Sequence, residues 1–334
     1  MKKGTQYDII VKNGLLIDPQ QRIHEKKDIA IMDRKVAAVE PSIPTTQAKK
    51  TIDASDMIVT PGLIDLHTHC TYGIVHLAID PESICLQRGT TTAIDAGSLG
   101  HLQFPAFRKY LVKTTKAKLY ALLNIESLGM VEFAKNEKWP ELITGKDEVF
   151  INVDETVKTI QENRDLILGI KWAHHGLTGV KLARNAADKA KCLVMAENHI
   201  QPETIKLLKK GDIITHLYHG LRSRPHDGLL NDEGKVQPEF FDAIRRGVIM
   251  DIGHGRGSFS WDVARTTLEQ GIRPDTISTD LHINSYSGPA YDMPTTMSKL
   301  LHLGLPLEEV VRANTTKPAE VISKQNEVGT LAPG

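Results

Sequence analysis

The feature that most constrains this chain is an apolar stretch that ends in two histidines. Residues 57–70 read Met-Ile-Val-Thr-Pro-Gly-Leu-Ile-Asp-Leu-His-Thr-His-Cys, and a Pro-Gly pair separates two apolar runs. The second run predicts a buried strand that ends at His67 and His69. Side chains two residues apart on a strand point to the same face, so both imidazoles face one way. Because imidazole is a common ligand of divalent transition metals, the pair predicts half of a metal site.

The overall composition excludes several classes of function. The chain has 334 residues, of which 40% are apolar and 25% charged, as in a globular protein with a sizeable core. Its 41 basic residues balance 41 acidic ones, so no basic field would attract nucleic acid or anionic lipid. The 3 cysteines form no Cys-x-x-Cys motif, which argues against a disulfide framework and fits a reducing cytoplasm. No apolar run reaches the length of a membrane span. We therefore expect a cytoplasmic protein that acts on a small molecule.

Residues 1–59 predict a small antiparallel β domain. The expected strands are 7–12, 15–17, 28–32, 36–39, 50–53 and 57–60. Asn13-Gly14 is a strong hairpin signal between the first two strands, and residues 33–35 indicate a second hairpin. No histidine cluster lies in this segment, so we expect its role to be structural.

From about residue 60, strand-like segments alternate with helix-like segments. The expected strands are 63–69, 91–97, 118–126, 167–173, 192–197, 213–219, 248–254 and 276–282. The expected helices include 81–88, 104–113, 153–163, 202–210, 238–246 and 260–270. This alternation indicates βα units and a parallel sheet. Eight such units predict an α/β fold, a TIM-like (β/α)8 barrel over residues 60–320, with its active site at the C-terminal ends of the strands.

A lysine lies inside the fourth expected strand, in the run Gly-Ile-Lys-Trp-Ala around Lys171. Burial of an ammonium is expensive, so desolvation lowers the lysine pKa and favours the neutral, nucleophilic amine. Such an amine can take up CO2 and become a carbamate, an anionic bidentate ligand. The alternative is a lysine that extends out of the strand to solvent.

Two further strand ends carry candidate ligands. His216 follows the apolar residues of the sixth strand, and His219, three residues later, is expected to face substrate. Asp280 ends the eighth strand, where a buried carboxylate needs a partner. Asp280 can contact a metal and take a proton from metal-bound water, which makes it the candidate general base. The alternative for Asp280 is a helix N-cap.

Loops after the seventh and eighth strands hold candidate substrate contacts. The seventh strand runs into Asp-Ile-Gly-His-Gly-Arg-Gly, and its glycines allow close backbone approach. We expect His254 and Arg256 to contact substrate, with Arg256 suited to an anionic group. The alternative is a glycine-rich turn with solvated side chains. His282 is the corresponding candidate after the eighth strand. Asp95, on the second strand, is a lesser candidate and more typical of a structural role.

Several of these strings resemble one branch of the amidohydrolase superfamily. They are the Pro-Gly-Leu-Ile-Asp-Leu-His-Thr-His stretch and segments 251–255, 277–280 and 291–297. The resemblance runs from about residue 7 to the last residue, and the branch is the amidohydrolase/deacetylase group, whose members are dihydroorotase-like or adenine-deaminase-like. It implies a metallohydrolase with two zinc ions or other divalent metals. Such an enzyme cleaves an amide or ester of a small carboxylated molecule with metal-bound hydroxide.

The resemblance also implies roles for individual residues. His67 and His69 would hold one metal, and His216 with a residue of the fifth strand would hold the other. Lys171 would be carbamylated and bridge the two metals, and Asp280 would move protons. In the fifth strand this chain departs from the family pattern: Glu197 takes the place of the usual histidine. His199 lies two residues further on the same face, so both Glu197 and His199 stay candidates.

The resemblance leaves three points open. In relatives, a Gly-Thr-Leu-x-x-Gly string introduces a strand that returns to the β domain, so we expect residues 321–334 to be a truncated return segment. The unpaired sheet edge would favour a homo-oligomer. A cyclic-amide hydrolase of the dihydroorotase or hydantoinase kind would use the same metals and is one alternative. The other alternative is a non-catalytic relative that serves as a scaffold protein.

Overall fold

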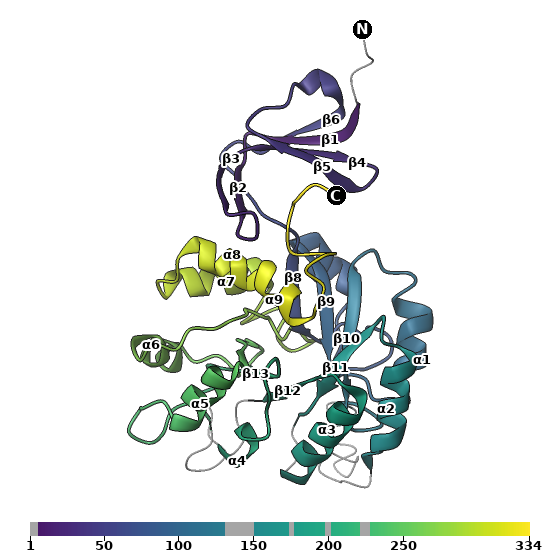
Figure 1. The fold of residues 1–334 in the computed structure, drawn as a ribbon, viewed down its shortest axis with the longest axis vertical. Helices are drawn as coiled ribbons and strands as arrows, with labels where there is room; N and C mark the ends of the chain where they lie inside the picture. Colours follow the sequence, from purple (N-terminus) through teal and green to yellow (C-terminus); the bar gives the residue numbers. More distant parts are fainter. Residues whose placement is uncertain (1–5, 131–149, 174–176, 198–201, 221–227) are drawn as a thin grey trace. The chain divides into compact units, whose positions relative to one another are not determined.

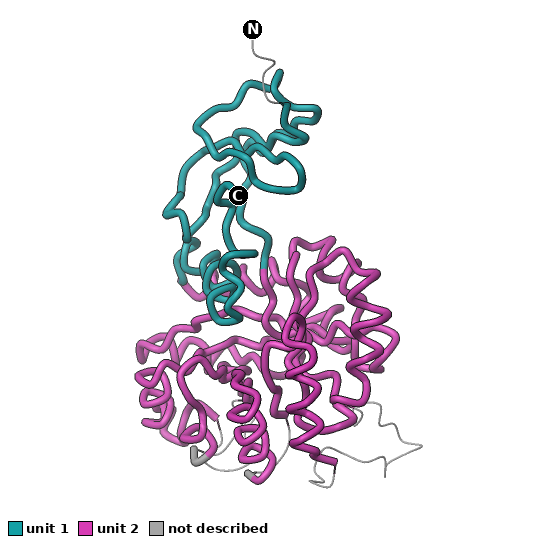
Figure 2. The backbone as a smooth tube through the Cα atoms, turned by 45° about the vertical axis from the view of Figure 1, so that its right-hand side comes forward, with its two compact units in different colours: residues 1–63, 305–334 teal, residues 64–304 magenta. Residues whose placement is uncertain are grey.

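The computed structural model describes residues 6–130, 150–173, 177–197, 202–220 and 228–334 (Figure 1). The chain divides into two compact units, residues 1–63 with 305–334 and residues 64–304 (Figure 2). The domain limits that we expected from the sequence place 305–320 with the barrel instead, and they remain a prediction.

The strands of the first unit form two small sheets. One sheet has the order β5-β4-β1-β6, and the other has the order β3-β2-β7. Their members are β1 (Tyr7–Lys12), β2 (Leu15–Asp18), β3 (Ile23–Lys26), β4 (Asp28–Met32), β5 (Lys35–Glu40), β6 (Ala48–Asp53) and β7 (Ile58–Val59). Ile10 and Ala30 of the first sheet form a buried apolar cluster with Ile43, which follows β5.

The hairpin predicted at Asn13-Gly14 is wrong. β1 pairs with β4 and β6, whereas β2 pairs with β3 and β7, so the chain changes sheet at this turn. The Asn13 backbone N–H donates to Asp28 Oδ1 at 3.0 Å, and its side-chain amide donates to Asp53 Oδ1 at 2.9 Å. Gly14 packs so closely on Val59 that a Cβ atom would overlap it. Long-range contacts therefore turn a hairpin sequence into a corner between sheets. The second predicted hairpin, between β4 and β5, is confirmed.

The C-terminal residues belong to the first unit. Helices α8 (Leu307–Asn314) and α9 (Thr316–Val321) precede a final segment without regular structure. The buried Asp18 carboxylate accepts hydrogen bonds from Thr330 Oγ1 at 2.8 Å and Leu331 N at 2.7 Å. Gly334 N donates to Val36 O at 3.1 Å, so the last residues contact β2 and β5.

The second unit is built around a sheet of seven strands in the order of the chain, from β8 to β14. They are β8 (Leu63–Thr68), β9 (Thr90–Ala96), β10 (Lys118–Asn124), β11 (Ile167–Lys171), β12 (Leu193–Glu197), β13 (Ile213–Thr215) and β14 (Ile249–Met250). Strands β9 to β14 pair in parallel. Almost every residue of these strands is buried, as expected for a parallel sheet enclosed by helices.

The eighth predicted strand is not a regular strand, yet its residues close the barrel. Thr276 forms a parallel bridge with Asp251, and Leu281 forms one with Thr68. Asp280 N also donates to His67 O at 2.6 Å. Residues 276–281, the closing segment, therefore join β14 to β8. The predicted barrel is confirmed, and isolated bridges rather than a regular strand pair the closing segment with its two neighbours.

The helices α2 (Val153–Glu162), α3 (Leu177–Ala190), α5 (Pro238–Arg246), α6 (Trp261–Glu269) and α7 (Met293–His302) lie outside the strands (Figure 1). α4 (Pro202–Ile205) is shorter than the helix predicted over 202–210. The segments 81–88 and 104–113 contain short helical turns rather than continuous α-helices. No helix within the described ranges is both long and apolar enough to cross a membrane.

Candidate metal centre

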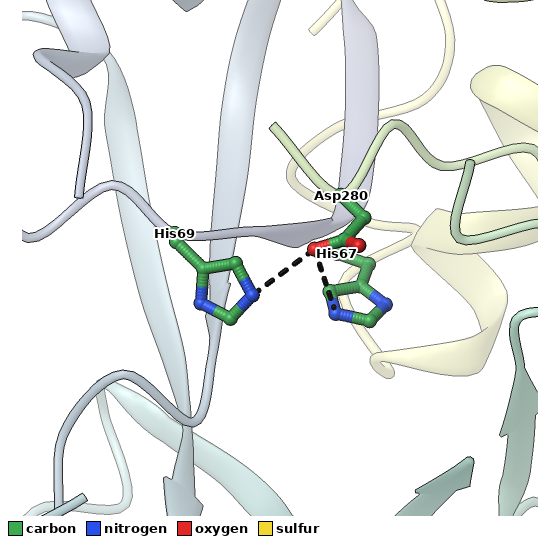
Figure 3. Close-up of side chains that lie close together, drawn as sticks. All are labelled: His67, His69 and Asp280. Carbon is green, nitrogen blue, oxygen red and sulfur yellow. Dashed lines mark ion pairs between the residues drawn. The ribbon is translucent and has the colours of Figure 1, made fainter. Parts of the chain in front are cut away.

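Three buried side chains meet at the C-terminal end of β8 (Figure 3). His69 Nε2 lies 3.0 Å from Asp280 Oδ1, and His67 Nε2 lies 3.4 Å from the same oxygen. The donor atoms of the three residues lie within 4.8 Å of one another. The strand end and the closing segment thus bring two imidazole nitrogens and one carboxylate to a point, which is a donor set suited to a divalent transition metal.

The His67 ring is oriented by a chain of buried hydrogen bonds. Its Nδ1 lies 2.8 Å from Thr215 Oγ1, and that hydroxyl donates to Asp251 Oδ2 at 2.8 Å. A threonine hydroxyl has one proton. Since the proton goes to the carboxylate, the hydroxyl oxygen must accept from His67 Nδ1–H. The Nε2 atom of His67 therefore carries a lone pair and faces Asp280.

The His69 ring has the same kind of support. Its Nδ1 lies 2.8 Å from Ser98 Oγ, which donates to Asp95 Oδ2 at 2.7 Å. By the same proton count, His69 Nε2 also presents a lone pair to Asp280. Supporting groups of this kind hold metal-binding histidines in one tautomer and one orientation. Sequence reasoning missed Ser98 and Thr215 and kept Asp95 as a lesser candidate, more typical of a structural role.

A second group of side chains adjoins the first. His216 Nδ1 donates to Gly253 O at 2.7 Å, and His216 Nε2 lies 3.7 Å from Glu197 Oε1. Lys171 Nζ lies 3.3 Å from His67 Nε2 and 3.6 Å from Glu197 Oε1. The lysine amine thus lies between the two groups. The sequence placed these residues at the ends of different strands, and the structure brings them together. His199 lies outside the described residues.

Electrostatics favour the ligand forms of these groups. Burial lowers the pKa of Lys171 and lowers that of His67 well below its ordinary value, and the Lys171 charge adds to the effect on His67. Burial alone would raise the pKa of Asp280, but the adjacent histidines lower it well below its usual range. His67 is therefore neutral and Asp280 ionised at neutral pH, which are the protonation states that bind metal.

The backbone is left-handed at two of these residues. His216 has φ of 59° and Asp280 has φ of 47°, a region that residues other than glycine rarely adopt. Such conformations persist where the surrounding structure stabilises them, and they are enriched at functional sites. The glycines of the loop after β14 fit this crowding. A Cβ on Gly253 would lie 2.2 Å from Thr215 Oγ1, and one on Gly255 would lie 2.3 Å from Asp280 Oδ2.

The four candidate substrate contacts lie at different distances from the ligands. The His282 ring centroid is 6.0 Å from that of His69, and the His219 centroid is 6.5 Å from that of His216. His254 is buried, and Arg256 is exposed. These two positions suit contacts deep in the site and at its rim, and the substrate roles of all four residues remain predictions.

Known proteins resemble this chain over most of its length. It is 36% identical to a deacetylase of Agrobacterium fabrum over 305 residues, which cover 87% of this chain and 72% of that relative. A crystal structure of a dihydroorotase matches with a TM-score of 0.83 and 32% identity, over 98% of this chain and 87% of that one. A crystal structure of an adenine deaminase matches with a TM-score of 0.84 and 32% identity, over 98% and 88%. No protein-family model matches. Because its fold and its sequence match these proteins over most of their length, the chain belongs to the amidohydrolase superfamily and is a hydrolase.

Proposed function

We propose that this hydrolase is a metal-dependent deacylase that cleaves an amide or ester of a small carboxylated molecule. The observation that carries the proposal is the buried meeting of His67, His69 and Asp280, with Lys171 Nζ 3.3 Å from His67 Nε2. The likeness to a protein named a deacetylase supports the type of reaction.

The residues present fit two divalent cations. Three imidazoles and two carboxylates form a nitrogen and oxygen donor set, for which zinc is the first candidate. His67, His69 and Asp280 would hold one cation. His216 would hold the other with Glu197, or with His199 in its place. Lys171 lies between the two groups, where a carbamate on its Nζ would add anionic oxygens. When bound, the cations would polarise the substrate carbonyl and activate a water molecule.

Asp280 is the residue that we propose to move the proton. It is ionised at neutral pH, and a carboxylate oxygen can accept a proton from the attacking water. Oδ1 contacts His69, while Oδ2 lies against Gly255, where the lack of a side chain leaves room. The protonated carboxyl would then donate to the leaving nitrogen or oxygen. His282, His219 and Arg256 would contact the rest of the substrate, whereas both ring nitrogens of His254 have protein partners, so its part would be indirect.

The test combines metal analysis with a substrate panel. We expect the purified full chain to hold two equivalents of zinc, and to hydrolyse members of a panel of N-acyl and O-acyl carboxylates. Removal of the metal by a chelator should abolish the activity, and zinc should restore it. A protein that is loaded with two equivalents of metal but cleaves none of these compounds would contradict the proposal.

A cyclic-amide hydrolase is the second candidate, because the chain is 32% identical to a solved dihydroorotase over 98% of its length. Dihydroorotate and hydantoins therefore belong in the same panel, and ring opening without acyl removal would favour this function. We also propose a cytoplasmic location, from the spacing of the cysteines, and a homo-oligomer. Fractionation and sedimentation would test these two points.

A further inference from the structure

Lys299 is a half-buried cation beside the metal centre that sequence reasoning did not identify. It lies on α7, and its Nζ is 2.7 Å from His254 Nε2 and 2.7 Å from Pro289 O. His254 Nδ1 donates to Gly255 O at 2.9 Å, so the ring is neutral and its Nε2 accepts from the ammonium. Both partners of Lys299 are therefore uncharged acceptors.

No acidic group in the part of the chain that the structure describes balances the charge of Lys299. Within the described residues, no carboxylate forms an ion pair with its Nζ. An ammonium has three N–H donors, and the two contacts use two of them. Half-burial of an uncompensated charge is costly, whereas an ionised partner would form a short, strong hydrogen bond. The Lys299 ammonium therefore has one N–H group left to donate and a positive charge that no described carboxylate balances.

The surroundings of Lys299 place this charge near the reacting groups. His254 is buried, and a Cβ atom on the next residue, Gly255, would lie 2.3 Å from Asp280 Oδ2. The Phe259 ring stacks on His254 with centroids 4.6 Å apart and planes at 9°, and Lys299 Nζ lies 5.9 Å from the Phe259 centroid. One flat apolar wall therefore flanks the ammonium on the side of the loop that follows β14.

We propose that Lys299, held by His254, binds the carboxylate of the substrate. The inference rests on the proposed function, and it names the residue that recognises the free carboxylate of the substrate. The third N–H of Lys299 donates to a carboxylate oxygen, and the Phe259 ring packs against the apolar part of the substrate. Arg256, exposed on the same loop, adds positive charge to the rim.

The experiment measures binding rather than turnover, so that it does not depend on the proposed reaction. The probes are methanesulfonyl derivatives of glycine, alanine and phenylalanine, each as the free acid and as the neutral amide. Their sulfonamide bond resists acyl hydrolysis. Calorimetry with the full chain as purified compares each acid with its amide. We expect the wild type to bind at least one acid about tenfold or more tightly than its amide, as a charge-assisted hydrogen bond predicts.

Two variants and a control isolate the charge of Lys299. Lys299→Gln keeps N–H donors for His254 and Pro289 but loses the charge, and Lys299→Met removes both; each should lose the acid preference. Lys189→Met, on α3, removes an exposed lysine that pairs with Asp154 at 3.0 Å, and it should keep the preference.

The outcomes decide between this inference and the proposed function. An acid preference that survives in folded Lys299→Gln, or its absence from all three probe pairs in the wild type, overturns the inference. A wild type that hydrolyses N-acyl carboxylates but shows no acid preference leaves the proposed function intact. A Lys299-dependent acid preference without any hydrolysis refutes the deacylase proposal alone.

Discussion

Replacement of Thr215 by Val should weaken metal binding much more than replacement of Thr276 by Val. Both side chains are fully buried, and both hydroxyls donate to the Asp251 carboxylate, at 2.8 Å and 2.7 Å. Only Thr215 also accepts from His67 Nδ1. The two variants therefore lose the same kind of bond to Asp251, and they differ in the support of the His67 ring.

The magnitude follows from these contacts. Loss of a hydrogen bond to a charged group costs about 1.5–3 kcal/mol, so the free energy of unfolding of the metal-free protein should fall by at least that amount in both variants, and further in Thr215→Val. Thr215→Val also leaves the His67 Nδ1–H without its acceptor, and the ring can then turn or change tautomer. Loss of such support typically costs about 10–100-fold in metal affinity. We expect that loss for Thr215→Val, and a change of less than about threefold for Thr276→Val.

Chelator competition on metal-free protein gives the zinc dissociation constants, and urea unfolding gives the stabilities. Ser278, which donates to Asp251 Oδ2 at 2.6 Å, is unchanged in both variants, so the carboxylate should keep that hydrogen bond. The reasoning is refuted if the two variants lose zinc affinity equally, or if Thr215→Val binds zinc as tightly as the wild type.

Four further predictions concern the same site. Asp280→Asn should retain zinc but lose hydrolysis, because an amide cannot take the proton; unchanged turnover would remove Asp280 from this role. Lys171→Ala should empty at least one metal position, and added short carboxylates should partly restore metal binding. Lys171→Arg should not bind metal at that position even with added carboxylates. Intact-mass analysis that finds an unmodified lysine in the metal-loaded protein would refute the carbamate. Burial, with the Lys299 charge, lowers the pKa of His254 to about 4. Unfolding then takes up a proton between pH 6.5 and 4, so the free energy of unfolding should decrease as the pH is lowered through this range. The decrease should be less steep in His254→Gln. Chelation should lower Tm, because a metal that binds only the folded state would stabilise it.

The barrel was predictable because its information is local and repeated. Each buried strand is a short apolar run followed by a helical segment, and the parallel order follows from that alternation. The Asn13-Gly14 turn shows where local information fails. Its sequence favours a hairpin, yet bonds to Asp28 and Asp53, distant in sequence, decide the conformation. Turn propensity is worth little against several tertiary contacts.

The candidate ligands were predictable for a different reason. Ionisable side chains are seldom fully buried, so a histidine, aspartate or lysine at the end of an apolar run carried the signal by residue type and position together. Hydroxyl groups are common, and nothing local marks Ser98 or Thr215 as the one that reaches a ring nitrogen. For Thr215 the register decides, because β12 and β13 pair Glu197 with Thr215 and so place His216 beyond the last pair. Lys299 lies on a helix surface, where a lysine is the expected residue, and only its contact with His254 marks it.

The weakest side of the barrel ladder is also the side that carries two of the proposed ligands. β13 has three residues, β14 has two, and the closing segment has isolated bridges only. Side-chain bonds replace the missing ladder. Asp251 accepts from hydroxyls on β13 and on the closing segment, and Asp65 Oδ1 accepts from His67 N at 3.2 Å and Thr279 N at 3.1 Å.

This exchange of ladder bonds for side-chain bonds has a functional consequence. A regular strand would require extended backbone at His216 and Asp280, whereas both residues are left-handed and direct their side chains into the centre. A cooperative network of buried hydroxyls and carboxylates tolerates that conformation because its donors come from side chains rather than from a continuous ladder. The side-chain hydrogen bonds that close the barrel therefore also orient the proposed ligands. A variant that loses one of these bonds should lower both the stability of the barrel and its affinity for metal.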